Sequence, residues 1–214
     1  MKEKILLFDL DGTLTDSKEG IINCARAALA AFGIEAEPSS LMGFIGPPLA
    51  WSFPHFFHLN EEQTEEAIRI YRQHYAAGGK FENRVYDGVR EMLTSLAGMG
   101  YRLAVATSKP EGFSCEILSH FDLARYFECI SGADPTQAGD KESVIRAALS
   151  RLGVTDPTDA LMIGDRLHDM IGAERVGMRS VGVLWGYGSR EELLEAGASA
   201  VCETPRDLVT LLAR

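Results

Sequence analysis

The sequence predicts an α/β fold, a doubly wound parallel sheet with a helical domain inserted after the first strand. Ile5–Phe8 is a short apolar run that stops at two acids, Asp9 and Asp11, and buried parallel strands read as such runs. From Tyr86 onward, candidate strands and helices alternate, which indicates a parallel sheet with helices on both faces. The intervening residues contain candidate helices and no convincing strand, so they form an insert.

The insert is expected to hold three helices, over Glu19–Phe32, Leu49–Phe57 and Glu61–Ala77. Because it follows directly on an acidic strand end, we expect it to act as a cap over that end. The sequence therefore predicts a core domain of residues 1–15 and 84–214 and a helical cap domain of residues 16–83.

Strands and helices are expected in turn through the rest of the chain. The expected strands are Tyr101–Thr107, Phe127–Ser131, Ala160–Gly164, Ser180–Trp185 and Ala200–Cys202. The expected helices are Asp87–Gly98, Pro110–His120, Lys141–Leu152, Asp169–Val176 and Asp207–Leu212. Glycines follow three of these helices, at Gly100, Gly153 and Gly177, and Pro110 stands where the first turn of a helix would begin.

Composition narrows the functional class. The chain has 214 residues, of which 46% are apolar, enough for one sizeable core and a small second one. Its net charge of −10 argues against a nucleic-acid partner. The four cysteines form no C-x-x-C pair, and the longest apolar stretch, Ile21 to Phe32, is too short to span a bilayer. We expect a cytoplasmic protein, a monomer or a homodimer, with no membrane partner and no signal peptide.

Polar residues stand where the predicted strands end, which is where ligands bind in open α/β sheets. Alternation along a strand puts Asp9 and Asp11 on the same side. The hydroxyls of Thr107 and Ser108, beside a helix start, can hold an anion.

Two further positions along the chain are expected to add charged side chains to this edge of the sheet. Lys141 stands at a helix N-terminus, where it opposes the helix dipole and therefore indicates function. Gly164 ends a strand just before Asp165, with Asp169 four residues further on. Such carboxylates, one lysine and hydroxyl donors suit a Mg²⁺ ion beside a phosphoryl group.

These residues resemble, in order and spacing, the four motifs of the haloacid dehalogenase superfamily. The stretches concerned are Asp9-Leu10-Asp11-Gly12-Thr13, Thr107, Lys141 and Gly164-Asp165-x-x-x-Asp169. The insert is similar to that superfamily's small α-helical cap. Phe44–Leu49, which contains Gly46-Pro47-Pro48, and Trp185-Gly186-Tyr187-Gly188 look like the phosphoglycolate phosphatase-like branch. The resemblance implies a Rossmann-like core and a hydrolase of phosphate monoesters.

Chemistry and the resemblance agree on the roles of the acids. Asp9 is the expected nucleophile, which forms an aspartyl-phosphate intermediate. Asp11 is the expected general acid toward the leaving oxygen and then the base for water. Mg²⁺ is expected on Asp9, the backbone carbonyl of Asp11 and Asp165, with Asp169 at the metal or behind one of its ligands.

The remaining candidates would contact the phosphoryl group or the substrate. Thr107 and Lys141 are expected to bind the transferred oxygens, and Lys141 also to orient Asp9. Further candidate contacts to phosphate or substrate are Gly12, Thr13, Ser108 and Gly46.

A small cap leaves room for small substrates, so the expected substrate is a small phosphorylated metabolite. Phosphoglycolate or a 5′-nucleotide is favoured, on the resemblance around Gly46 alone. A phosphomutase of the β-phosphoglucomutase type shares all four motifs and stays open as an alternative. A non-catalytic phosphate-binding protein is a further alternative, against which the intact Asp9 and Asp11 argue.

Overall fold

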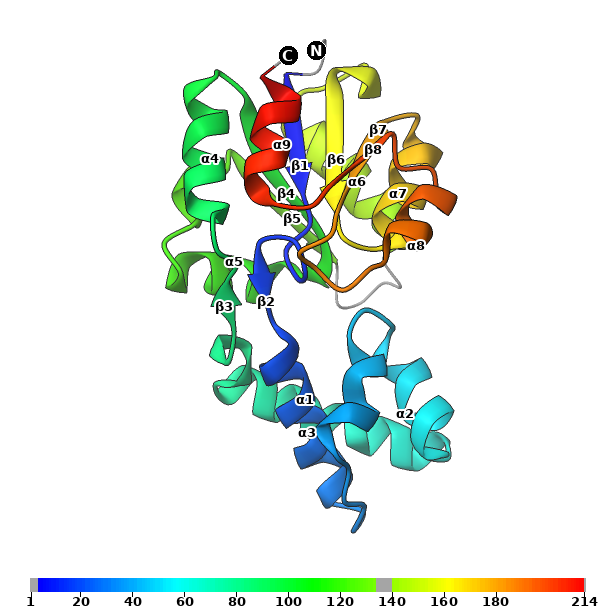
Figure 1. Ribbon diagram of the computed structural model, residues 1–214. Helices are drawn as coiled ribbons and strands as arrows, with labels where there is room; N and C mark the ends of the chain where they lie inside the picture. Colours follow the sequence, from blue (N-terminus) through cyan, green and yellow to red (C-terminus); the bar gives the residue numbers. More distant parts are fainter. Residues whose placement is uncertain (1–3, 134–139, 214) are drawn as a thin grey trace. The chain divides into compact units, whose positions relative to one another are not determined.

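The computed structural model describes residues 4–133 and 140–213, and its internal contacts divide the chain into two compact units. The core unit comprises Met1–Asp16 and Val85–Arg214, and the helical unit comprises Ser17–Arg84. Figure 1 shows the elements of both along the chain. Where the chain passes from one unit to the other, β2 (Thr15–Asp16) and β3 (Arg84–Val85) form a two-stranded sheet.

The core unit is built on a six-stranded sheet in the order β5-β4-β1-β6-β7-β8, in which every neighbouring pair is parallel. The strands are β1 (Ile5–Phe8), β4 (Arg102–Pro110), β5 (Cys129–Ala133), β6 (Ala160–Gly164), β7 (Arg179–Val183) and β8 (Ala200–Cys202). All four residues of β1 are buried between β4 and β6. The predicted α/β fold with a parallel sheet is confirmed.

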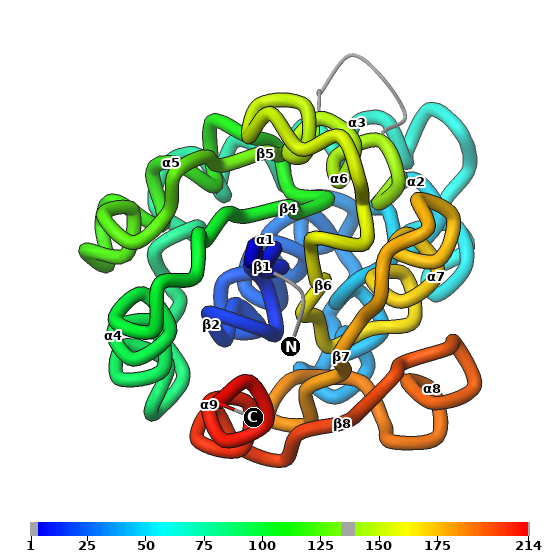
Figure 2. Tube along the Cα trace, turned by 90° about the horizontal axis from the view of Figure 1, so that it is seen from above, coloured from blue at the N-terminus to red at the C-terminus, as the bar shows by residue number. Residues whose placement is uncertain are grey.

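Helices cover both faces of this sheet, as the view in Figure 2 shows. Leu6 and Phe8 belong to a core formed with α4 (Val89–Gly98), α5 (Glu111–His120) and α9 (Pro205–Leu212). Because alternate side chains of a strand point to opposite faces, Ile5 and Leu7 belong to a second core. That core includes α6 (Lys141–Arg151) and α7 (Leu167–Val176).

Shorter elements complete the core unit. Helix α8 (Arg190–Glu195) packs against β7 and β8, where Leu193 lies over Gly182. Two single 3₁₀ turns are η3 (Ala124–Tyr126) and η4 (Pro157–Asp159).

The helical unit holds the three helices that the sequence predicts, together with two 3₁₀ segments. Its elements are α1 (Lys18–Ala30), η1 (Pro38–Phe44), α2 (Leu49–Phe57), α3 (Glu61–Ala77) and η2 (Gly79–Phe81). Helix α3 begins with a capping box in which Asn60 and Gln63 exchange side-chain and backbone hydrogen bonds. In the apolar interior of the helical unit, the rings of Phe44 and Phe53 meet edge to face, with centroids 4.9 Å apart.

Several predicted bounds differ from those in the structure, among them the start of α4 and the end of β4. Helix α4 begins at Val89 and not at Asp87, because the chain turns at the N-cap residue Gly88, whose φ of +82° favours glycine. Strand β4 continues past Thr107 to Pro110, with a register irregularity between Ala106 and Pro110.

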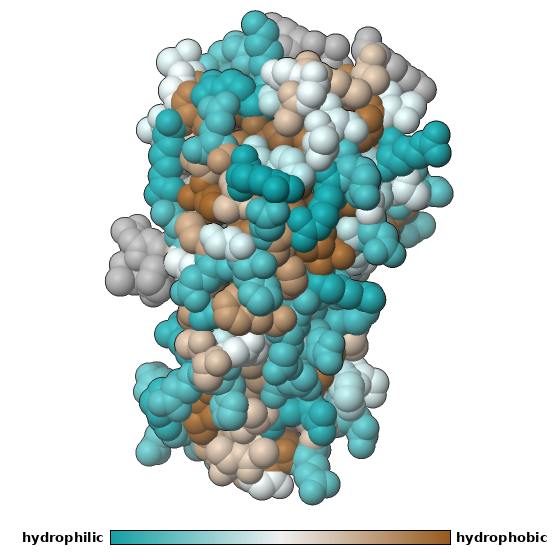
Figure 3. Space-filling model, turned by 90° about the vertical axis from the view of Figure 1, so that its left-hand side faces the viewer, coloured by the Kyte–Doolittle hydropathy of each residue, from teal (hydrophilic) through white to brown (hydrophobic). Residues whose placement is uncertain are grey.

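The surface is polar on the face drawn in Figure 3, where hydrophobic residues occur in small groups. No helix within the described ranges, 4–133 and 140–213, is both long enough and apolar enough to cross a bilayer.

Candidate active site

The turn after β1 carries the first two candidate acids. The Asp9 amide donates to the Ile163 carbonyl at 2.9 Å, which extends the pairing of β1 with β6 by one residue. The chain then reverses at Gly12, whose φ is +81° and whose amide donates to the Thr15 carbonyl at 2.8 Å. A Cβ atom at Gly12 would overlap the carboxylate of Asp165. Glycine is therefore required both by the backbone and by the close approach of that acid.

The end of β6 supplies two more acids, and both are buried. Asp165 accepts hydrogen bonds from the Thr13 hydroxyl at 3.2 Å and from the Tyr187 amide at 2.9 Å. Asp169, in the first turn of α7, accepts from the Arg166 amide at 3.1 Å. Each acid is thus held by the backbone or side chains of neighbouring turns.

Three carboxylates converge at this edge of the sheet. Asp9, Asp165 and Asp169 each contribute one oxygen to a group whose members lie within 4.8 Å of one another. Burial, together with the charges of Asp169 and Asp9, raises the pKa of Asp165 well above its ordinary value. Oxygen donors that repel one another in a buried site fit a hard divalent cation such as Mg²⁺.

Lys141 is the cation that faces this group. Its Nζ lies 2.8 Å from Oδ1 of Asp9 and 2.7 Å from Oδ1 of Asp169, and it donates to the Ala106 carbonyl at 3.1 Å. Burial alone would lower the pKa of Lys141, but Asp169 and Asp9 outweigh burial and raise it. The lysine is therefore held in its charged form against the predicted nucleophile.

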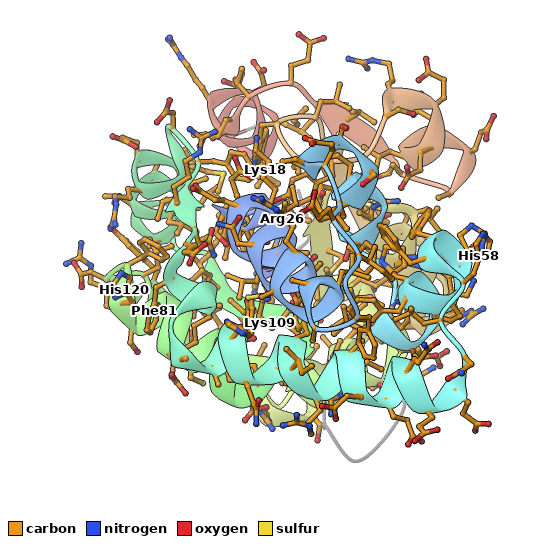
Figure 4. The ribbon with its side chains drawn as sticks, turned by 90° about the horizontal axis from the view of Figure 1, so that it is seen from below. Lys18, Arg26, His58, Phe81, Lys109 and His120 are labelled. Carbon is orange, nitrogen blue, oxygen red and sulfur yellow. The ribbon has the colours of Figure 1, made fainter. Side chains whose placement is uncertain are left out.

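A second lysine, Lys109, reaches the site from the end of β4 and is labelled in Figure 4. Its Nζ lies 2.7 Å from Oδ2 of Asp11, and its amide donates to the hydroxyl of buried Thr107 at 3.3 Å. No role is predicted for Lys109 from the sequence. Its position two residues beyond Thr107, at the same strand end, is the only signal in the sequence that points to it.

The loop after β7 closes over the turn of Gly12. The Trp185 indole donates to the Thr13 carbonyl at 2.8 Å, and the Tyr187 hydroxyl donates to Asp16 at 3.1 Å. A Cβ atom at Gly186 would overlap the Gly12 carbonyl and Asp165. These contacts tie the loop after β7 to the turn that follows β1, and the sequence pattern alone does not predict them.

The structure therefore gathers most of the predicted site residues in the core unit. Those at or beside the carboxyl ends of β1, β4 and β6 are Asp9, Asp11, Gly12, Thr13, Thr107, Lys141, Asp165 and Asp169. The Asp11 carboxylate pairs with Lys109 and is not part of the three-acid group. Ser108 is exposed, and Gly46, with a φ of +106°, lies in the helical unit between η1 and α2.

Comparison with known proteins identifies the family. The sequence profile of the haloacid dehalogenase-like hydrolases matches residues 6–183, which is most of the chain. The chain belongs to this family. The prediction of a haloacid dehalogenase-type enzyme is confirmed.

Several curated proteins are similar to this chain in sequence. A protein named 5′-nucleotidase from Pseudomonas aeruginosa is 46% identical over 88% of this chain and 86% of its own length. Tyrosine-protein kinase PtkA from Mycobacterium tuberculosis is 40% identical over 92% of this chain and 67% of its own. Phosphoglycolate phosphatase 1 from Pseudomonas aeruginosa is 31% identical over 96% and 78%.

A solved structure agrees with this placement. The crystal structure of a predicted phosphatase from Clostridium acetobutylicum is 45% identical and has a TM-score of 0.91. The superposition covers 99% of this chain and 98% of that one.

Proposed function

We propose that this protein is a Mg²⁺-dependent phosphomonoesterase that acts on a small phosphorylated metabolite through an aspartyl-phosphate intermediate. One observation carries the proposal. The Asp9 carboxylate lies beside Lys141 at 2.8 Å and within 4.8 Å of the acids Asp165 and Asp169. A carboxylate that attacks an anionic phosphate needs positive charge nearby and a fixed orientation. Lys141 can orient Asp9, and the neighbouring acids can hold a cation beside it.

The residues that would hold Mg²⁺ are Asp9, Asp165 and the backbone carbonyl of Asp11, with Asp169 at the ion or behind a ligand. When bound, the ion would offset the repulsion between an anionic phosphate and the carboxylates. Burial and repulsion by Asp169 and Asp9 together raise the pKa of Asp165, which supports a cation there, because a positive charge would favour the carboxylate form.

In the proposed reaction, an oxygen of Asp9 attacks the phosphorus atom while Asp11 gives a proton to the leaving oxygen. Asp11 then accepts a proton from the water that attacks the phospho-aspartate, and inorganic phosphate departs. Lys141 orients Asp9 and, with Thr107, contacts oxygens of the transferred group. The turn at Gly12 and Thr13 and the hydroxyl of Ser108 are further proposed contacts.

A 5′-nucleotide is the preferred substrate class within this proposal. The relative named 5′-nucleotidase is 46% identical to this chain, against 31% for the one named phosphoglycolate phosphatase. The proposed compartment is the cytoplasm, which suits the four cysteines, all of them free thiols. Gly46 is proposed as a substrate contact.

The decisive experiment is a panel of phosphate monoesters assayed for released phosphate with Mg²⁺. The panel includes nucleoside 5′-monophosphates, phosphoglycolate and sugar phosphates. We expect turnover with Mg²⁺, none in EDTA, and none for Asp9→Asn, whose circular dichroism should match that of the wild type. Full activity in EDTA or in Asp9→Asn would contradict the proposal.

Transfer of the phosphoryl group from the enzyme to a sugar phosphate or to a tyrosine peptide, in place of water, would show a transferase instead. Incubation with a sugar bisphosphate separates the mutase from the phosphatase, because only the mutase returns an isomerised sugar phosphate.

A further inference from the structure

The two oxygens of the Asp11 carboxylate have different surroundings. Oδ2 lies 2.7 Å from Nζ of Lys109, whose side chain is only 8% exposed. Oδ1 is buried, and within the described part of the chain no hydrogen-bond partner reaches it. Leaving a buried carboxylate oxygen without a partner is costly, so such an atom calls for a functional explanation.

A lysine ammonium carries donors and no acceptor. The oxygen that faces Lys109 can therefore only accept, and any proton on Asp11 must reside on the other oxygen, Oδ1. We infer that Lys109 is a positioning residue that assigns the proton-carrying role to Oδ1 of Asp11. This inference rests on the proposed phosphomonoesterase function. It adds a residue that determines which oxygen of Asp11 gives its proton to the leaving group.

The backbone holds Lys109 in place for this task. Its amide donates to the Thr107 hydroxyl at 3.3 Å, and Pro110, which follows it, has a restricted φ. Gly132 of β5 lies so close that a Cβ atom there would be 2.6 Å from the Lys109 carbonyl. The register irregularity of β4 between Ala106 and Pro110 includes Lys109. The lysine is therefore anchored on both sides.

The step that Lys109 supports is the departure of the leaving group. As the bond from phosphorus to the ester oxygen breaks, Asp9 forms the new bond to phosphorus. The proton on Oδ1 of Asp11 moves to the departing oxygen, which leaves as an alcohol, and Asp11 becomes a carboxylate. Lys109 then faces a full negative charge, which it stabilises at short range.

The test uses leaving groups that differ in their need for a proton. An alkyl phosphate such as a nucleoside 5′-monophosphate needs a proton on its leaving oxygen, whereas p-nitrophenyl phosphate hardly does. We expect Lys109→Met to lower kcat/KM by about a hundredfold for the nucleotide and by less than about fivefold for p-nitrophenyl phosphate, in line with the size of general acid catalysis. The ratio kcat/KM is the right measure because it covers only the steps up to loss of the leaving group.

Two comparisons make the result specific. Asp11→Asn should show the same dependence on the leaving group, and the Lys109→Met/Asp11→Asn double variant should lose little more than Asp11→Asn alone. Lys4→Met, a change at an exposed lysine, is the matched control and should leave both substrates unaffected.

Equal losses on both substrates would overturn the inference, because they would indicate a role in phosphate binding or in folding. An unchanged kcat/KM for the nucleotide would overturn it as well. Absence of phosphatase activity in the wild-type protein on either ester would instead defeat the proposed function itself.

Discussion

Lys141 balances the charge of two carboxylates of the site at once. It lies within 2.8 Å of two carboxylates, Asp9 and Asp169, and is itself buried. Removing one partner from a buried ion pair leaves an uncompensated charge, which costs far more than losing an exposed pair.

We therefore predict that Lys141→Met lowers the free energy of unfolding by roughly 3–5 kcal/mol and abolishes turnover. Urea unfolding followed by circular dichroism measures the first effect and released phosphate the second. Arg146→Met, on the same helix, breaks an exposed pair with Glu142 and should cost less than about 1 kcal/mol. A Lys141→Met variant as stable as Arg146→Met would contradict this account.

At the scale of single residues, the sequence predicts the acids better than their partners. Asp9 and Asp165 are predictable because each follows a buried apolar strand, where an acid has no stabilising role. The contacts of the partner residues Lys109 and Tyr187 are not predictable, because a position near a strand end or in a resembling loop does not say which acid a side chain or amide will meet. Their contacts with Asp11 and Asp165 depend on how distant strands meet.

Among the elements, the loop that follows β7 packs tightly on the site. Gly186 lies where a Cβ atom would overlap both the Gly12 carbonyl and the Asp165 side chain. Any larger residue must displace one of two groups that the proposed reaction needs.

Gly186→Ala is accordingly predicted to reduce kcat at least tenfold and to destabilise the protein by about 1–3 kcal/mol through overpacking. Thermal unfolding and nucleotide hydrolysis measure the two effects. Gly98→Ala serves as the control, since a Cβ atom at this position in α4 meets no neighbour within 4 Å. It should be neutral or stabilising by up to about 1 kcal/mol.

Helix α8 supports the loop between β6 and α7 through Glu192. Its carboxylate accepts from Arg166 Nε at 2.8 Å and from the Leu167 amide at 2.9 Å. Burial alone would raise the pKa of Glu192, but these two hydrogen bonds lower it below its ordinary value. A lowered pKa means that the folded state favours the carboxylate, so the contact stabilises the fold once the side chain is ionised.

This gives a pH-dependent prediction for Glu192→Gln. The variant should be less stable than the wild type by about 1 kcal/mol at pH 7, above the ordinary pKa of Glu192. The difference should shrink as the pH falls below the ordinary pKa of Glu192 and through its lowered pKa in the folded state. Urea titrations at several pH values measure it, with Glu195→Gln on the same helix as control. A difference that does not change with pH would contradict the assignment.

The elements also show where prediction from sequence succeeds. Four elements have the predicted bounds: helices α2 and α3 and strands β6 and β8. Proline, asparagine or glycine marks the ends of the helices, and the strands are uninterrupted apolar runs. Helix α8 escapes prediction because six residues are too short to show a helical period. The contribution of Glu192 is hidden for the same reason.

Considered as a whole, the protein concentrates buried acids at one edge of its sheet. Ligands that bind only the folded state stabilise it in proportion to their affinity. We predict that millimolar Mg²⁺ raises the melting temperature by a few degrees, and that Asp165→Asn loses this response. Differential scanning calorimetry with and without EDTA provides the measurement.

Without Mg²⁺, Asp165→Asn should be at least as stable as the wild type, since one of three repelling carboxylates is gone. Asp122→Asn, at an exposed turn with a φ of +55° that asparagine tolerates, should keep the full Mg²⁺ response. An undiminished response in Asp165→Asn would place the cation elsewhere. The prediction of a monomer or a homodimer is addressed separately, by sedimentation.

The central place of β1 has a consequence for how the chain emerges from the ribosome. Ile5–Phe8 is synthesised before both of its partners in the sheet, Arg102–Val105 on one side and Ala160–Ile163 on the other. The helical unit, Ser17–Arg84, is continuous and can pack first. Nascent chains that end before β6 must therefore carry an apolar strand with an open edge, which is the state that chaperones bind and that aggregates.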